Sequence, residues 1–170
     1  RECAVVNTDL TATSQQYLTF RLAGETFALD IAKVREVLEY RSLTKLPQTP
    51  ESVRGVINLR GHVVPVVDLN LRFGNRETET TVDTCIVITE VEIDGTVAHI
   101  GALVDAVDEV FELEDDRIEP PPRMGLNLDT SYVRGMGKRD DDFVIVLDAD
   151  RVFDARDAAL SRSEREETSV

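Results

Sequence analysis

Short runs in which apolar and polar residues alternate follow one another along most of the chain. Leu18, Phe20 and Leu22 alternate with polar neighbours, and this period of two predicts a β-strand that residues 27–29 join as a hairpin partner. We also expect strands at residues 37–40, 63–67, 84–92, 97–104 and 143–147, of which residues 63–67 are apolar on both faces. From Asp150 onward the apolar residues recur at a helical spacing, which predicts a helix near the C-terminus. The whole pattern is typical of a mainly β protein.

Proline, glycine and aspartate residues mark the ends of these runs. Loops are expected at residues 46–50, 74–83 and 120–122. Asp94-Gly95 is a favoured hairpin turn, and Asp30 is placed to cap a single helical turn over residues 31–34. Pro65 interrupts a Val-rich run and cannot donate a ladder hydrogen bond, so we expect that strand at a sheet edge or at a bulge.

The second half of the chain repeats the first. Residues 33–39 read KVREVLE, residues 106–112 read AVDEVFE, and the triplet Val-Arg-Gly occurs at 53–55 and again at 133–135. Beyond the triplet one register pairs Val64 with Val144, Val66 with Val146, Asp68 with Asp148 and Phe73 with Phe153. Chance similarity between Val-rich strands is the alternative, but it leaves the shared triplet and spacing unexplained. Two β units of about 75 residues are marginal alone, so we expect them to share a core.

Composition and charge narrow the class of protein. Hydrophobic residues make up 42% of the 170 residues and charged residues 31%, whereas aromatics are 5% and Trp is absent, so the core must consist mainly of Val, Ile and Leu. The net charge of −14 opposes binding to nucleic acid or to an anionic membrane surface, because phosphates require Lys and Arg. It fits a protein partner or a solvated acidic surface.

Neither a membrane protein nor a secreted one is indicated. No apolar run approaches the ~18 residues that a membrane-spanning helix needs, and no signal peptide is visible. The chain begins at Arg1 without a Met, so a few native residues are expected to be missing, and the expected location is the cytoplasm. Cys3 and Cys85 are far apart and show no disulfide framework or zinc spacing. Cys85 lies in an apolar run and is expected to be a small buried hydrophobe.

We find no catalytic or metal-binding constellation. His62 follows Gly61 and is expected to be exposed, whereas His99 alternates within a strand and is expected to be structural; neither has a metal-ligand neighbour at helical spacing. Nucleotide loops and nucleophile elbows are absent, and the acids at 115–116 and 140–142 are expected in solvated turns. We therefore expect no enzyme activity, no cofactor and no metal. A hydrolase is the alternative, and it would need a base and a nucleophile that the sequence does not reveal.

A motif in the first half of the chain points to a known family. Asn58-Leu-Arg-Gly61 is followed at fixed distances by Val64-Pro-Val-Val-Asp-Leu69 and Phe73-Gly74. This combination resembles the CheW family of bacterial chemotaxis coupling proteins. Segments that also look like the family, in the same order, lie at residues 17–20, 27–31, 34–37, 47–50, 101–105, 118–120 and 132–137. The resemblance covers residues 16–153, most of the chain.

The resemblance implies a fold and a domain organisation. Members of the family have two five-stranded SH3-like β-barrels that share a hydrophobic core, which is consistent with the duplication. We therefore expect a mainly β, CheW-like domain of two interleaved repeats at residues 16–160, with the predicted C-terminal helix at its end. Residues 1–15 and 161–170 are expected to be flexible tails.

The resemblance also implies a function without chemistry. Family members are adaptors that link transmembrane chemoreceptors to a chemotaxis histidine kinase, which makes these two the expected partners, with self-association in arrays as a further one. In the family, the tip of the receptor's helical hairpin binds in a groove between the barrels. The matching positions in this chain are Ile31, Val34, Glu36 and Arg60. The kinase contacts an exposed apolar barrel end. We place that end at Val104, Val107 and Val110.

Arg60 is the residue on which the receptor hypothesis depends. Gly55 and Gly61 allow tight turns, so Arg60 is expected on a corner from which its guanidinium meets a carboxylate or a helix carbonyl of the partner. The alternative is an internal ion pair with Glu36, and both hold if the pair opens on binding.

Two other interpretations stay open. The same module can belong to a larger chemotaxis protein, either the kinase's regulatory domain or a coupling protein with a receiver domain. A β-barrel that binds nucleic acid or a small ligand is the second. The negative charge and the few aromatic residues available for stacking count against nucleic acid.

Overall fold

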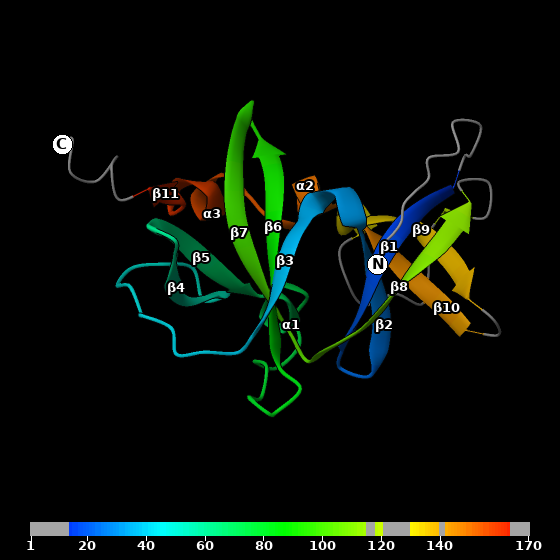
Figure 1. The fold of residues 1–170 in the computed structure, drawn as a ribbon, viewed down its shortest axis with the longest axis horizontal. Helices are drawn as coiled ribbons and strands as arrows, with labels where there is room; N and C mark the ends of the chain where they lie inside the picture. The colour runs from blue at the N-terminus through cyan, green and yellow to red at the C-terminus, as the bar shows by residue number, and fades with distance from the viewer. Residues whose placement is uncertain (1–13, 115–117, 121–129, 140–141, 164–170) are drawn as a thin grey trace.

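The computed structural model describes residues 14–114, 118–120, 130–139 and 142–163. The turns expected at residues 115–116 and 140–141 lie outside these ranges, as do residues 1–13 and 164–170 of the two predicted tails. Strands dominate the described residues, and the helices among them are short (Figure 1). The prediction of a mainly β protein is confirmed.

One sheet, here sheet A, contains five strands and forms one end of the molecule (Figure 1). Its strands are β1 (Ser14–Leu22), β2 (Glu25–Asp30), β8 (Ala106–Glu114), β9 (Val133–Arg139) and β10 (Asp142–Leu147). They lie in the order β8-β1-β2-β10-β9, and all neighbours are antiparallel except β2 and β10, which are parallel. Leu18 lies opposite Leu29, and Phe20 opposite Phe27, so the predicted first hairpin is confirmed.

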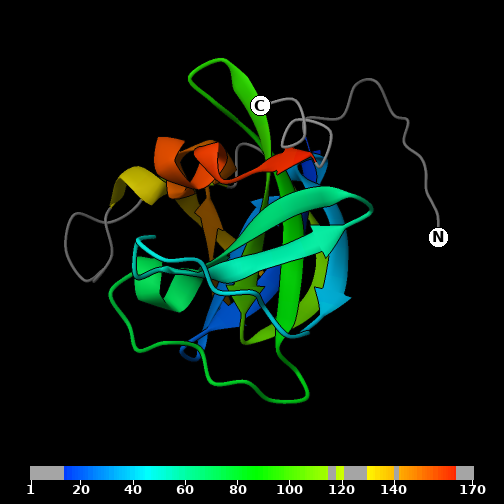
Figure 2. The ribbon, with the colours of Figure 1, turned by 90° about the vertical axis from the view of Figure 1, so that its left-hand side faces the viewer.

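The other sheet, sheet B, has the same size apart from one short added strand. Its strands are β3 (Val34–Glu39), β4 (Val53–Leu59), β5 (His62–Asp68), β6 (Cys85–Ile93), β7 (Thr96–Val104) and the two-residue β11 (Arg162–Ser163). They lie in the order β4-β5-β7-β6-β3, with β11 against the start of β5. The β6–β7 hairpin projects beyond the rest of the sheet (Figure 1, Figure 2). Asp94 and Gly95 both have positive φ at its tip, as expected for the predicted turn.

The two sheets repeat one topology. In the register of the sequence repeat, β3, β4, β5, β6 and β7 of sheet B correspond to β8, β9, β10, β1 and β2 of sheet A, and the strand order is the same. The halves are interleaved, because β1 and β2 lie with β8–β10, whereas β6 and β7 lie with β3–β5. Two five-stranded units, as the resemblance implies, are therefore present.

The largest hydrophobic cluster is shared by both sheets. Its buried side chains include Leu18 and Phe27 from sheet A, Val87 and Ile100 from sheet B, and Phe153 from the C-terminal segment. Two smaller clusters each lie within one sheet. Because burial of apolar surface is the main favourable term in folding, each small unit is stabilised in large part by the other. The shared core expected from the duplication is present.

Short helical turns connect the strands. They are the 3₁₀ turns η2 (Ile31–Lys33) and η4 (Thr130–Tyr132) and the helices α1 (Leu69–Arg72), α2 (Ala149–Val152) and α3 (Ala155–Ala159). η2 carries the chain from sheet A to sheet B, and the Asp30 side chain caps it by accepting the N–H of Ala32 at 2.9 Å. The predicted cap and helical turn are confirmed.

The helical pattern expected near the C-terminus is present, but it is divided in two. Asp154 interrupts it because its side chain accepts the N–H groups of Arg156 and Asp157 and starts a new helix, while the Asp157 carboxylate accepts the Asp154 N–H. Asp157 is fully buried, and Arg72 donates to its two oxygens at 2.9 and 3.0 Å. This ion pair holds α3 against α1.

Pro65 lies inside sheet B and not at its edge, but the alternative expected from the sequence, a bulge, occurs in the β4–β5 pair, where the register shifts between Val53 and Gly55. β5 pairs with β4 on one side and with β7 and β11 on the other. Val56, opposite Pro65, directs its own N–H and C=O away to Thr44, at 2.8 and 2.9 Å. The nitrogen of Pro65, which carries no hydrogen, therefore faces the other side of β5. It lies between Val63, which pairs with β11, and Val66, which pairs with β7, so no ladder hydrogen bond is lost.

Candidate partner-binding groove

A groove of about 380 Å³ opens on sheet B beside the β4–β5 turn. Val64 and Ile88, which are almost fully buried, form its floor. The side chains around this floor are Arg35, Glu36, Leu59, Arg60, His62 and His99. An apolar surface with a few polar groups placed around it is the usual arrangement of a binding site.

Arg60 stands on a tight turn beside this groove. Arg60 and Gly61 have φ values of +52° and +84°, the left-handed pair required by a two-residue hairpin turn of this kind. The Asn58 side chain accepts the Gly61 N–H at 3.0 Å and closes the turn. The Asn-Leu-Arg-Gly motif thus fixes the backbone of Arg60, while its side chain remains 71% exposed.

Arg60 forms a two-armed ion pair with Glu36 of β3. Its Nη1 lies 2.6 Å from one carboxylate oxygen and its Nη2 3.2 Å from the other. The hydrogen bond from Arg60 lowers the pKa of Glu36, and the same bond raises the pKa of Arg60. The internal ion pair considered from the sequence is therefore present. Because exposed ion pairs contribute little to stability, it can open for a partner at little cost.

A β-bulge in β3 brings a second ion pair to the groove. The register between β3 and β6 shifts between Val34 and Glu36, and Arg35 and Glu36 both line the groove. Nε of Arg35 donates to Oε1 of Glu90 at 2.8 Å, and Nε2 of His99 lies 3.1 Å from the same oxygen. The hydrogen bond from Arg35, assisted by that from His99, lowers the pKa of Glu90.

Sequence reasoning finds Glu36 and Arg60 but misses the other polar residues of this groove. It treats His62 and His99 separately, as an exposed and a structural residue, whereas their ring centroids lie 6.5 Å apart. They meet because β5 and β7 are parallel neighbours in sheet B. No local signal reports this pairing.

Ile31 and Val34 lie beside the groove and are not part of its lining. They belong to η2 and to the first residue of β3, where the chain passes from sheet A to sheet B. Both side chains are partly buried against the shared core. The four residues named from the resemblance thus form two pairs, Glu36 with Arg60 at the groove and Ile31 with Val34 at the junction of the sheets.

The three valines assigned to an exposed apolar end differ in exposure. Val104 is fully buried because β7 lies between β5 and β6, so its expected exposure is wrong. Val107 is partly buried against the shared core. Val110 is 47% exposed on β8, which is an edge strand of sheet A. Of these three residues, Val110 presents the most apolar surface to solvent.

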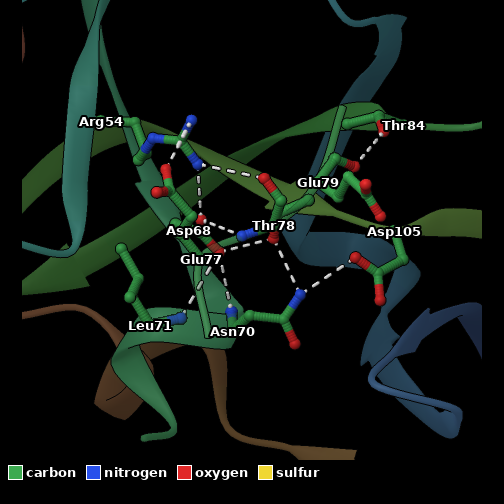
Figure 3. A network of polar contacts seen from close by, with 9 residues as sticks. All are labelled: Arg54, Asp68, Asn70, Leu71, Glu77, Thr78, Glu79, Thr84 and Asp105. Carbon is green, nitrogen blue, oxygen red and sulfur yellow. Dashed lines mark hydrogen bonds and ion pairs between the residues drawn. The ribbon is translucent and has the colours of Figure 1, made fainter. Parts of the chain in front are cut away.

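A buried polar network lies at the other end of β5, away from the groove (Figure 3). The fully buried carboxylate of Asp68 accepts hydrogen bonds from Arg54 Nη1 at 2.8 Å, from Thr78 N at 2.8 Å and from Thr78 Oγ1 at 2.6 Å. It also caps α1 by accepting the N–H groups of Asn70 and Leu71. One carboxylate thus fixes the start of α1 and the loop that follows it.

The network continues from Asn70 to the other sheet. The Asn70 amide donates to Thr78 Oγ1 at 2.8 Å and to Asp105 at 3.0 Å (Figure 3). Asp105 lies where the chain passes from β7 to β8, and its carboxylate also accepts the N–H of Ala23 in the β1–β2 turn at 2.9 Å. These contacts join sheet B to sheet A, which indicates a structural rather than a catalytic role.

Other side chains that could bind a metal or react are dispersed over the molecule. Within the described residues, no three or more His, Cys, Asp or Glu side chains are placed to hold a metal ion. Cys85 is partly buried, and this burial raises the pKa of its thiol. None of the helices in the described part of the chain is long and apolar enough to span a membrane.

The chain resembles chemotaxis proteins along most of its length. A family model described as a CheW-like domain matches residues 16–157. The chain is 33% identical over 152 residues to the chemotaxis protein CheW of Rhizobium meliloti (strain 1021), covering 88% of this chain and 96% of that protein. It is 30% identical over 146 residues to the chemotaxis protein CheW of Klebsiella aerogenes, covering 86% of each.

A solved structure has the same fold. The scaffolding protein TtCheW from Thermoanaerobacter tengcongensis matches with a TM-score of 0.76 and 37% sequence identity, over 90% of this chain and 96% of that one. The resemblance drawn from the Asn-Leu-Arg-Gly motif is thereby confirmed. With its repeated five-stranded sheets, and with relatives that match it nearly end to end, the chain belongs to the CheW family of chemotaxis scaffolding proteins.

Proposed function

We propose that this chain is a cytoplasmic adaptor that couples chemoreceptors to the chemotaxis histidine kinase and catalyses no reaction itself. Its relatives are named as chemotaxis proteins and as a scaffolding protein, which supports a role in assembly. The observation that carries the proposal is the geometry of Arg60. Its backbone is fixed by the turn, its side chain is exposed, and it stands beside a groove with an apolar floor.

The receptor tip binds at this groove and at the adjoining junction between the sheets. An arginine fork presents five N–H donors, of which the pair with Glu36 engages two, so it can meet a carboxylate or a helix carbonyl of the receptor. Ile31 and Val34 lie next to this point and supply apolar contact. Polar groups fix the register, and apolar burial provides affinity.

The kinase binds a different surface, on the edge strand β8. Val110 is the exposed large hydrophobic residue of this strand, and its apolar side chain becomes buried in the contact. This assignment keeps the two partners apart, because β8 belongs to sheet A and the groove to sheet B. One adaptor can then hold both partners at once.

Charge reversal at Arg60 tests the receptor site. Arg60→Glu should weaken binding of a receptor cytoplasmic fragment by at least about tenfold, because like charges then meet across the contact. Arg60→Lys should retain part of the affinity, since an ammonium cannot form the two-armed contact. Arg21→Glu is the matched control: Arg21 is 60% exposed and pairs with Asp108 at 3.1 Å on sheet A. It should leave receptor affinity unchanged.

The outcomes separate a binding role from a structural one. Thermal melting and kinase affinity should change little in Arg60→Glu. If melting falls sharply and both affinities drop together, Arg60 acts as a structural ion-pair partner. If receptor affinity is unchanged, the groove is not the receptor site.

Val110→Glu tests the kinase surface in the same assays. It should lower kinase affinity and leave receptor affinity intact, because a charge replaces an apolar side chain at the edge of sheet A. Val97→Glu on β7 is the control, since Val97 is also exposed but belongs to sheet B. Equal effects of the two variants on kinase binding would exclude β8 as the specific contact.

A further inference from the structure

The groove holds both histidines of the protein. The sequence contains two His residues, His62 on β5 and His99 on β7, and both line the groove. His62 is exposed and His99 is partly exposed, so both rings are accessible to solvent. Histidine side chains change charge between about pH 5 and 8. A histidine-dependent change of charge is therefore confined to this groove.

Basic groups are the outermost charges around the two rings. Among the residues whose side chains the structure describes, the charged groups that line the groove or pair with its lining are Arg35 and Glu36 of β3, Arg60 of the turn and Glu90 of β6. In both ion pairs the arginine side chain is more exposed than its glutamate partner. The four charges sum to zero, but the outer member of each pair, toward the solvent, is an arginine.

The repeat in sheet A supplies an internal comparison. The positions equivalent to His62, His99, Arg35 and Glu90 hold Asp142, Thr26, Asp108 and Arg21. The Arg35–Glu90 pair therefore recurs as Asp108–Arg21, with the signs exchanged. In sheet A the same backbone carries Asp142 and Asp108 in place of His62 and Arg35, and Thr26 in place of His99. The two histidines and the exposed arginine of the groove are therefore not a by-product of the fold.

We propose that the groove binds a carboxylate-bearing segment of its partner, and that protonation of His62 and His99 tightens this binding as the pH falls. The inference rests on the proposed function, in which the groove receives the receptor tip. Carboxylates of that segment lie over the two arginines and the two imidazoles. Apolar side chains of the same segment cover the floor of the groove.

Two effects follow from protonation. Each imidazolium adds a positive charge on the side from which the partner approaches, and two exposed charge pairs amount to a roughly three- to tenfold gain in affinity. Arg35 and His99 share Oε1 of Glu90. A charged His99 binds that oxygen more strongly, which releases Arg35 for the partner. Because the groups are exposed, the gain should shrink at high salt.

The test compares wild type with the double variant His62→Gln/His99→Gln. Affinity for the receptor cytoplasmic fragment is measured at about pH 6 and pH 8, on either side of the histidine range. Wild type should bind roughly three- to tenfold more tightly at the lower pH. The double variant should lose this difference and keep the wild-type melting temperature, whatever its affinity at the higher pH. Any change of charge on the receptor fragment itself affects wild type and the double variant equally, so it cancels when their pH dependences are compared.

Each outcome has one meaning. If wild type binds and Arg60→Glu does not, but pH has no effect or acts equally on the double variant, the inference is overturned and the proposed function stands. Weaker binding at the lower pH shows that the groove meets a basic segment, and also overturns the inference. If the fragment fails to bind at either pH, or binds Arg60→Glu as it binds wild type, the proposed function fails and the inference fails with it.

Discussion

The two carboxylate oxygens of Asp68 have different partners, and one substitution separates them. Oδ1 accepts the N–H of Asn70 and the hydroxyl of Thr78, whereas Oδ2 accepts Arg54 Nη1 and the N–H of Thr78. Asp68→Asn keeps an oxygen that caps α1, since Asn is as good an N-cap as Asp. It places an NH₂ group where Oδ2 lies, so the two donors there lose their acceptor.

The expected loss of stability follows from these two donors. Thr78 is almost fully buried, and a buried group left without a partner costs about 1–3 kcal/mol. The Arg54 side chain is 20% exposed and retains Glu77 at 3.2 Å, so its charged hydrogen bond is taken at the low end, about 1.5 kcal/mol. The sum is about 2.5–4.5 kcal/mol, which lowers the melting temperature by roughly 5–18 °C in a chain of this size.

The repeat supplies the control. Asp148, the equivalent of Asp68, caps α2 by accepting the N–H of Asp150 at 3.1 Å, but its side chain is 37% exposed and Arg151 lies 3.6 Å away. Asp148→Asn should cost less than about 0.5 kcal/mol, because it keeps the cap and leaves no buried donor alone. Equilibrium unfolding in urea measures both variants. Equal losses, or a larger loss at Asp148, would refute the role assigned to Oδ2.

Two further predictions concern the repeat and the groove. Gly55→Ala and Gly135→Ala should each destabilise the protein by about 1–3 kcal/mol, as measured by urea unfolding. The reason is that an added Cβ would lie 2.7 Å from a backbone carbonyl oxygen at both positions. Wild-type stability in either variant would contradict this packing. Arg60→Gln should raise the pKa of Glu36, since it removes the hydrogen bond that lowers it, and leave the pKa of Glu90 low. Carboxyl NMR titration checks both shifts, and an unchanged Glu36 would speak against the ion pair in solution.

The repeat can be recognised in the sequence because some of its matching residues are the ones that the backbone conformation requires. A Cβ at Gly55 would meet the carbonyl oxygen of Thr44, and a Cβ at Gly135 would meet that of Glu119, both in segments that bridge to the residue after the glycine. The chain therefore requires glycine at the same place in each unit. Strand periods and turn residues act over a few positions in the same way, so local patterns predict them.

The groove depends on contacts that no local pattern carries. His62 and His99 meet through the parallel pairing of β5 with β7, and Val104 is buried by the same arrangement. In sequence, the valines of a central strand look like those of an edge strand. Glu36 and Arg60 are found through the family resemblance, because their ion pair joins β3 to a turn 24 positions away.

The groove and the buried network occupy opposite ends of β5, so the stability of one supports the geometry of the other. His62 begins this strand directly after the Arg60 turn, and Asp68 ends it. Between them β5 is paired on both sides, which makes it one of the better-supported strands of sheet B. From Asp68 the hydrogen bonds continue through Asn70 and Asp105 to the β1–β2 turn of sheet A. A partner that contacts both the groove and the junction of the sheets needs these two surfaces at a fixed separation. The network at the far end of β5 helps to provide it.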